Sequence, residues 1–170
     1  MKTRQQQELT EMERLQQELI EIENIYKTKQ IETQQAYINY LIINNKIDDI
    51  TPKPSRFGKG SSSEKNYKEY IIIYEKTKLI EMKYPNRLNI KVEVYKTEVI
   101  DDDDDIEYGC KVIYHLLETT YFKNMEEANN YKKEYKKEYE KKYKKNNLSF
   151  DIYLINEDDT LSKHTYGYGG

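Results

Sequence analysis

The sequence predicts an α+β fold in which a long N-terminal helix precedes a small antiparallel sheet with one packed helix. Three observations predict it. The first fifty residues contain no Gly and no Pro and are rich in Gln and Glu. Apolar and polar residues alternate near residue 90 and again near residue 150. Between these two segments, tyrosines recur at helical spacing.

The chain of 170 residues has room for one small domain and an appendage. Charged residues make up 35% and the mean hydropathy is -1.04, so few large aliphatic side chains remain for a core. We therefore expect a small globular part that is helped by association. The expected organisation is a helical segment over 1–50, a flexible linker over 51–66, an α+β domain over 67–157 and a polar Gly/Tyr tail over 158–170.

The N-terminal segment carries apolar residues at steps of three and four. This spacing is typical of the a and d positions of a two- or three-stranded coiled coil, whose seam needs a partner. The frame slips at Lys29, and a broader apolar face follows that we expect to pack on the globular part. We predict that the seam residues bind the partner: Met12, Leu15, Leu19, Ile22, Tyr26.

Charges beside this seam bear on the choice of partner. The charged residues at the flanking e and g positions are mostly Glu, and Glu repels itself in a homodimer unless a basic helix supplies the other strand. The sequence therefore slightly favours a different protein over a second copy, and it leaves helix orientation open. The formal net charge of -3 by itself indicates neither nucleic acid nor an acidic partner.

Residues 51–66 read TPKPSRFGKGSSSEKN, and hydrophobic periodicity stops there while Pro, Gly and Ser cluster. This composition is typical of a flexible linker. A phosphate-binding loop is the functional alternative for RFGKGSSS. The stretch lacks the G-x-x-x-x-G-K-[ST] spacing and follows no apolar strand, so we expect no nucleotide site.

Strands are expected on both sides of an acidic run. Residues 70–74 are rich in Ile and Tyr, which favour strands. Residues 88–95 alternate apolar and polar side chains, as a strand with one wet face does. Gly109 predicts a bulge in the strand that follows. We expect strands over residues 70–74, 79–82, 88–95, 107–121 and 148–154.

A helix is expected over residues 124–145, with Asn124 and Glu127 forming a capping box at its start. Its tyrosines often recur at steps of four, and each such step drifts by about 40° on an α-helix. The stripe therefore winds, and we expect one or two tyrosines to meet solvent or a second chain.

The same helix suggests an alternative function. Eight Lys and three Glu lie between residues 130 and 145, interleaved with Tyr. Lysines bind phosphates and aromatic rings stack on bases, so this pattern indicates a nucleic-acid surface. The competing interpretation is a Tyr stripe packed on the sheet below a wet Lys/Glu face. The lysines of the nucleic-acid hypothesis are Lys132, Lys133, Lys136 and Lys137.

Residues that carry chemistry do not assemble into a site. Cys110 and His115 lie five residues apart on one expected strand and face opposite sides unless a bulge resets the phase. Neither His115 nor His164 has neighbours at metal-ligand spacing. The five Asp at residues 101–105 indicate a solvated hairpin tip, with weak cation binding as the alternative. We expect no enzyme, no cofactor and no metal centre.

The composition and the terminal segments bear on the kind of source genome and on the cellular location. Lys, Ile, Tyr and Asn, which have A/T-rich codons, make up 74 residues, as in proteins from AT-rich genomes such as those of many large DNA viruses. No apolar signal segment or membrane span is seen, so we expect a cytoplasmic protein that binds no membrane. The terminal Gly-Gly resembles the tail of ubiquitin-like modifiers, but the expected strand order differs from that fold.

These expectations together describe a non-enzymatic structural protein that oligomerises or docks a partner through its N-terminal helix. The α+β module then supplies a second contact surface, within a large assembly such as a virus particle. The alternative is a nucleic-acid-associated protein that uses the Lys/Tyr-rich helix.

Overall fold

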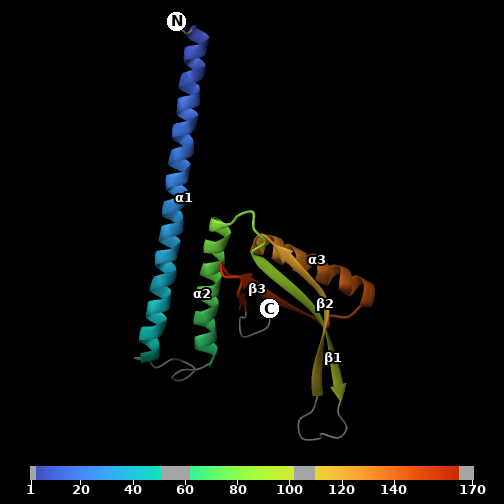
Figure 1. The fold of residues 1–170 in the computed structure, drawn as a ribbon. Helices are drawn as coiled ribbons and strands as arrows, with labels where there is room; N and C mark the ends of the chain where they lie inside the picture. Colours follow the sequence, from blue (N-terminus) through green and yellow to red (C-terminus); the bar gives the residue numbers. More distant parts are fainter. Residues whose placement is uncertain (1–2, 51–61, 102–109, 165–170) are drawn as a thin grey trace.

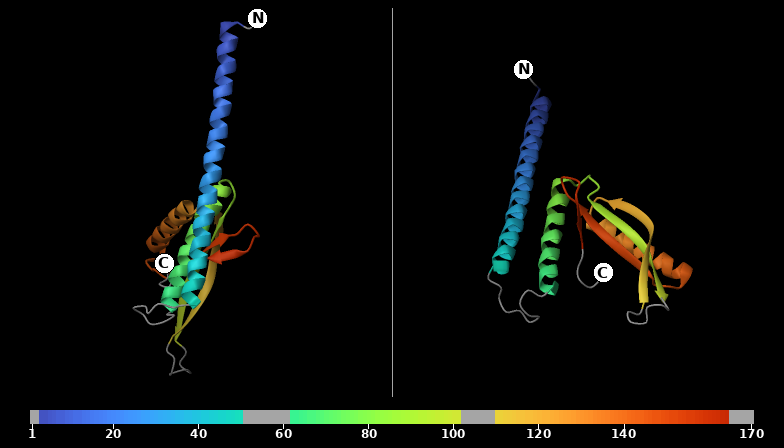
Figure 2. Two further views of the ribbon diagram at one scale, coloured as in Figure 1. Left: turned by 90° about the vertical axis from the view of Figure 1, so that its left-hand side faces the viewer. Right: turned by 60° about the horizontal axis from the view of Figure 1, so that its bottom comes forward.

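The computed structural model describes residues 3–50, 62–101 and 110–164, and it shows the expected α+β fold (Figure 1). A long helix and a shorter helix lie side by side, and the sheet with a third helix lies beyond the shorter one (Figure 1, Figure 2). The elements in chain order are α1 (Arg4–Ile50), α2 (Ser62–Lys83), β1 (Ile90–Asp101), β2 (Cys110–Phe122), α3 (Met125–Tyr143), β3 (Leu148–Ile155) and β4 (Leu161–Lys163).

Helix α1 begins at a capping box and runs for 47 residues, which confirms the predicted long N-terminal helix. The Thr3 backbone N–H donates to Gln6 Oε1 (3.0 Å), and the Gln6 N–H donates to Thr3 Oγ1 (3.3 Å). Two of the unpaired donors at the helix start are thereby satisfied. Every side chain from residue 3 to residue 30 is exposed, because this part of α1 projects beyond the rest of the molecule (Figure 1).

Helix α2 replaces two of the expected strands. Residues 70–74 and 79–82 are helical, so the strand prediction for them was wrong. The helix lies between α1 and the sheet and is covered on both sides, and Thr77, Leu79 and Ile80 are all buried. A helix buried on two sides carries apolar runs in place of a single stripe, and Ile-rich runs have the composition of strands.

Several boundaries also differ from the expectation. The last residues of the expected linker, 62–66, already belong to helix α2, whereas residues 51–61 lie outside the described part of the chain. The expected polar tail contributes strand β4, in which Lys163 pairs with Tyr153 of β3. The bulge expected at Gly109 also lies outside the described residues.

The sheet has the strand order β2-β1-β3-β4, and all neighbouring strands are antiparallel. The strands predicted over residues 88–95, 107–121 and 148–154 correspond to β1, β2 and β3. The register between β1 and β2 shifts after Val94, which pairs with Glu118, whereas Tyr95 pairs with Leu116. Leu117 is therefore an extra residue in β2, which is the arrangement of a β-bulge.

The core lies on one face of the sheet. Ile90, Val92 and Val94 of the central strand β1 are fully buried, as alternate residues of a half-covered strand are. Leu154 of β3 and Ala128 of α3 complete the centre of this core. The opposite face of the sheet carries the intervening side chains of β1 and their partners.

Helix α3 covers the core face and begins where expected. The Asn124 side chain accepts a hydrogen bond from the Glu127 backbone N–H (2.9 Å) at the N-cap. Tyr131 and Tyr135 pack against the core, whereas Tyr143 in the last turn is 51% exposed. The predicted winding of the tyrosine stripe is thus confirmed.

Asn89 joins three segments at the start of β1. Its side chain is fully buried, and Nδ2 donates to the carbonyl oxygens of Tyr84 and Lys123, each at 2.9 Å. The backbone carbonyl oxygen of Asn89 accepts a hydrogen bond from the Ile155 backbone N–H (2.8 Å). The ends of α2, β2 and β3 are thereby tied together at one residue.

Replacing Asn89 with Ala removes both side-chain donors and leaves two carbonyl oxygens without these partners. A buried polar group left unsatisfied costs about 1–3 kcal/mol. We expect Asn89→Ala to lower the free energy of unfolding by about 3 kcal/mol, measured by urea denaturation, and the exposed turn variant Asn86→Ala to change it little. Equal stability of the two variants would contradict this role of Asn89.

Candidate assembly surface on helix α1

The five predicted seam residues are all exposed in the single chain. They belong to the N-terminal part of α1, which projects beyond the rest of the molecule (Figure 2). Their exposed fractions range from 53% for Leu15 to 66% for Tyr26. The free energy of the system falls when a second surface removes large apolar side chains of an isolated helix from water. The structure therefore presents the seam as an open surface.

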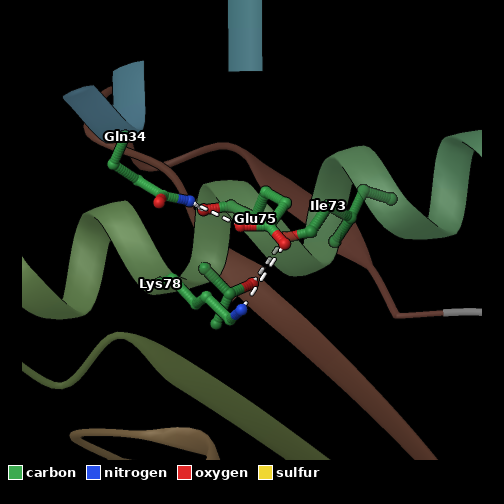
Figure 3. A network of polar contacts seen from close by, with 5 residues as sticks. Gln34, Ile73, Glu75 and Lys78 are labelled. Atoms are coloured by element: carbon green, nitrogen blue, oxygen red, sulfur yellow. Dashed lines mark hydrogen bonds and ion pairs between the residues drawn. The ribbon is translucent and has the colours of Figure 1, made fainter. Parts of the chain in front are cut away.

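Helix α2 packs against a different side of α1. Gln34 Nε2 donates to the Glu75 backbone oxygen (3.1 Å) and to Glu75 Oε2 (2.6 Å), which joins the two helices (Figure 3). Ile38 is 1% exposed and lines a hollow between the helices together with Leu79 and Ile80. Glu75 is also paired with Lys78 (3.4 Å) on α2.

The pattern of exposure separates the two sides of α1 clearly. With Met12 as position a, the buried and half-buried side chains of residues 31–43 all fall at positions b, c and f. All a, d, e and g side chains in the same range are exposed. Position f lies opposite the a/d seam, so α2 leaves the seam free.

The seam therefore does not end at Lys29. The same heptad frame continues through Ala36, Tyr40 and Ile43, and Tyr40 and Ile43 are 59% and 57% exposed. The apparent slip in the sequence arises because a second apolar face, directed at α2, begins at Ile31. Tyr40 and Ile43 were not among the predicted seam residues, although counting heptads across the polar Lys29 layer places them at positions a and d.

Exposed apolar residues on α1 gather on the seam side. Of the α1 side chains that the structure describes, eleven large hydrophobic ones are exposed, and ten of these occupy positions a, d, e or g. Ile20, at position b, is the exception. Exposed hydrophobic residues on a monomer are usually scattered, and their concentration on one line is typical of interaction surfaces.

Ion pairs within α1 reduce the glutamate repulsion expected from the sequence. Arg14 pairs with Glu11 (3.6 Å) and with Glu18 (3.7 Å), the two glutamates at consecutive g positions. These pairs are exposed, and each is worth less than about 1 kcal/mol. They nevertheless place a positive charge, at position c, beside these two glutamates, which weakens the argument that only a basic partner helix fits.

The Lys/Tyr helix α3 is a less open surface. Lys132 is half-buried with Nζ 5.5 Å from the centroid of the Phe150 ring, and burial and then Lys136 lower its pKa. Lys133, Lys136 and Lys137 are exposed. The tyrosines of its first turns pack in the core, so they do not offer free rings for base stacking.

The histidines and the cysteine do not form a joint site in the described part of the chain. His115 Nε2 lies 2.8 Å from Glu98 Oε2 on the exposed surface of β1 and β2. His164 lies near α2, with Nε2 2.8 Å from Thr77 Oγ1. The side chains of Asp101 and Cys110 lie outside the described part, as do residues 102–105 of the acidic run and the terminal Gly-Gly.

No group of three His, Cys, Asp or Glu side chains in the described ranges is arranged to hold a metal ion. Within those same ranges, no helix is both long enough and apolar enough to cross a membrane. Comparison of the chain with protein-family models, with curated proteins and with solved structures found no match.

His164 holds strand β4 to α2 in its neutral form. The Thr77 hydroxyl donates to the Ile73 carbonyl oxygen (2.7 Å), so the imidazole Nε2–H is the donor to Thr77 Oγ1. Burial lowers the pKa of His164 to about 4. The folded state therefore disfavours protonation that an unfolded histidine, with a pKa of about 6.5, accepts readily.

This difference predicts a loss of stability in acid. As the pH falls below the unfolded pKa toward the folded one, protons bind preferentially to the unfolded chain. Between pH 7.5 and pH 5 we expect His164 to contribute a loss of about 2 kcal/mol in the free energy of unfolding. In urea denaturation at both pH values, His164→Gln should remove this part of the pH dependence and His115→Gln should keep it. The same pH dependence in all three proteins would contradict the assignment.

Proposed function

We propose that this chain is a non-enzymatic assembly protein that oligomerises or docks a partner through the seam of α1. The observation that carries the proposal is the continuous line of exposed apolar residues at the a and d positions of a projecting helix. The energetic reason is that an isolated helix is marginally stable in water and gains most from packing an apolar face.

The geometry of the projecting part supports this role. The part of α1 from residue 4 to residue 30 would be about 40 Å long at 1.5 Å per residue. A helix of that length without tertiary contacts frays unless a partner covers it. Leu15, Leu19 and Ile22 are more than half exposed in the single chain, so their burial would supply the driving force.

The sheet offers a second contact surface in this proposal. Tyr114, Leu116 and Tyr121 of β2 are exposed and pair with β1 residues on the face opposite α3. Exposed aromatic and aliphatic residues on one sheet face are typical of binding surfaces. A chain with an oligomerising helix and a separate binding face can connect a second component to the assembly.

Two neighbouring residues test the seam. Leu19 and Ile20 have similar exposures, 55% and 50%, but only Leu19 lies on the seam. We expect Leu19→Glu to reduce the mass of the full-length oligomer to that of the monomer, because it places charges in an apolar layer. Ile20→Glu should keep the wild-type mass, since its carboxylate faces solvent. Light scattering coupled to size-exclusion chromatography measures both.

The possible outcomes distinguish self-association through the seam from docking to a different protein. If Leu19→Glu keeps the oligomeric mass, or if both variants lose it equally, the seam does not hold the assembly together. If the wild-type chain is already a monomer at high concentration, self-association is contradicted and only docking to a different protein is left.

The alternative is a nucleic-acid-associated protein. The observation that favours it is the exposure of Lys133, Lys136 and Lys137 along one helix. Lysines on a helix contact phosphates without sequence preference, and the affinity then depends on salt. The half-buried position of Lys132 and the packed tyrosines count against this function.

A salt titration tests this alternative. Binding of the full chain to a fluorescent single-stranded oligonucleotide should weaken at least tenfold between roughly 50 and roughly 200 mM salt. At either salt concentration, Lys137→Glu should weaken oligonucleotide binding relative to the wild-type chain, whereas Lys96→Glu on β1 should have a smaller effect. Absence of binding, or the same affinity in both salt concentrations, would contradict a nucleic-acid role.

A further inference from the structure

Helix α1 has two apolar faces over the same residues. One face packs on α2 through Ile38 and Leu41, whereas the other carries Tyr40 and Ile43 into solvent. A helix whose function ended with its projecting part would need only the first of these faces beside α2. The second face continues the heptad frame of the seam, so it requires an explanation of its own.

We infer that a second copy of this chain packs along the seam from Met12 to Ile43 and continues beside the α1–α2 hairpin. This inference rests on the self-associating form of the proposed function. The interface then extends over 32 residues, or about 47 Å of helix. The overhang of α1 supplies only the first part of it.

The position of α2 makes this pairing sterically possible. Over residues 31–43 the half-buried and buried side chains beside α2 lie at positions b, c and f of α1, and position f lies opposite the seam. In a pair of α1 helices, each α2 therefore lies on the outer side of its own α1. The sheet lies still farther out, beyond α2 (Figure 1).

The seam also has the features of a surface that fits its own copy. Apolar residues lie on both sides of one polar stretch, Lys29 and Thr33, at constant heptad spacing. A second copy offers the same spacing over the same length, and a single polar stretch helps to fix the alignment of two such helices at some cost in stability. Arg14 already compensates the glutamates at 11 and 18, so no basic partner is needed.

The flanks of the seam agree with a self-complementary interface. Ile25 at position g and Tyr37 at position e are 60% and 45% exposed, and both widen the apolar line. In a parallel, in-register pair, each g residue faces the e residue five positions later on the partner helix. Between residues 11 and 37, Glu18 opposite Glu23 is the one such pair that carries like charges.

The same substitution on the two helices of the hairpin tests the inference. Tyr40 on α1 and Tyr74 on α2 are both exposed, at 59% and 43%, but only Tyr40 lies on the seam. We expect Tyr40→Glu in the full-length chain to weaken self-association by about 100-fold, since both copies place a charge in one layer. Tyr74→Glu should leave the association constant within about threefold. Concentration-dependent light scattering measures the constants, and circular dichroism checks that both variants fold.

This test distinguishes failure of the inference from failure of the proposed function. If Leu19→Glu dissociates the oligomer but Tyr40→Glu does not, the seam stops at the overhang and the inference is overturned. If the wild-type chain is a monomer, pairing with a second copy is overturned, although docking to another protein is not.

Cross-linking locates the second copy directly. In a Cys110→Ser background, Ile43→Cys should react with a short bismaleimide to give a covalent dimer if the helices are parallel. If they are antiparallel, it should cross-link to Met12→Cys in mixed samples instead. Either product places the hairpin part of α1 in the interface. The inference would be overturned if neither product forms while the projecting part of α1 still cross-links. That control is a covalent dimer of Leu15→Cys or of Leu19→Cys, or a cross-link between these two variants in a mixed sample.

Discussion

The packing of helix α2 between α1 and the sheet is the contact on which the rest of the molecule depends. Ile38 of α1 is buried against α2, whereas Ile80 on α2 belongs to the core of the sheet. Glu81 at the end of α2 accepts a hydrogen bond from the Met125 N–H (2.7 Å) and so fixes the start of α3. Burial raises the pKa of Glu81 more than this bond lowers it. One helix therefore sets the direction of α1 and the position of α3.

The same contact determines which side of α1 is free. Because α2 occupies positions b, c and f over residues 31–43, the a and d side chains from Thr33 to Ile43 are exposed beside α2. The exposed seam residues and the ion pair of Arg14 with Glu11 both lie on the part of α1 that projects beyond α2. One end of the seam is held by the contact with α2, whereas the side chains at the other end, from residue 3 to residue 30, are all exposed in the single chain.

The sequence predicted the elements whose signal is local. The alternation at Ile90, Val92 and Val94 identified β1, and the Asn124 cap identified the start of α3, because each pattern reports one face or one end. The heptad spacing of the α1 seam is a local pattern of the same kind, and its role as an interface stays a prediction.

The elements that were missed are shaped by contacts with more than one neighbour. Helix α2 is covered on two sides, so its buried residues follow one another and the run from 70 to 74 has the composition of a strand. The seam at Tyr40 was hidden because the α2-facing residues are interleaved with it. Strand β4 has three residues, and its pairing with β3 depends on tertiary structure.

Hydrogen exchange of the full-length chain tests the central claim most directly, since it reports on the seam residue by residue. If α1 is a self-association surface, backbone amides of residues 12–30 should exchange as slowly as those of α2, although no tertiary contact covers them in the single chain. Fast exchange over residues 12–30 at high protein concentration, beside slow exchange in α2, would mean that the helix has no partner of its own kind and would contradict the account.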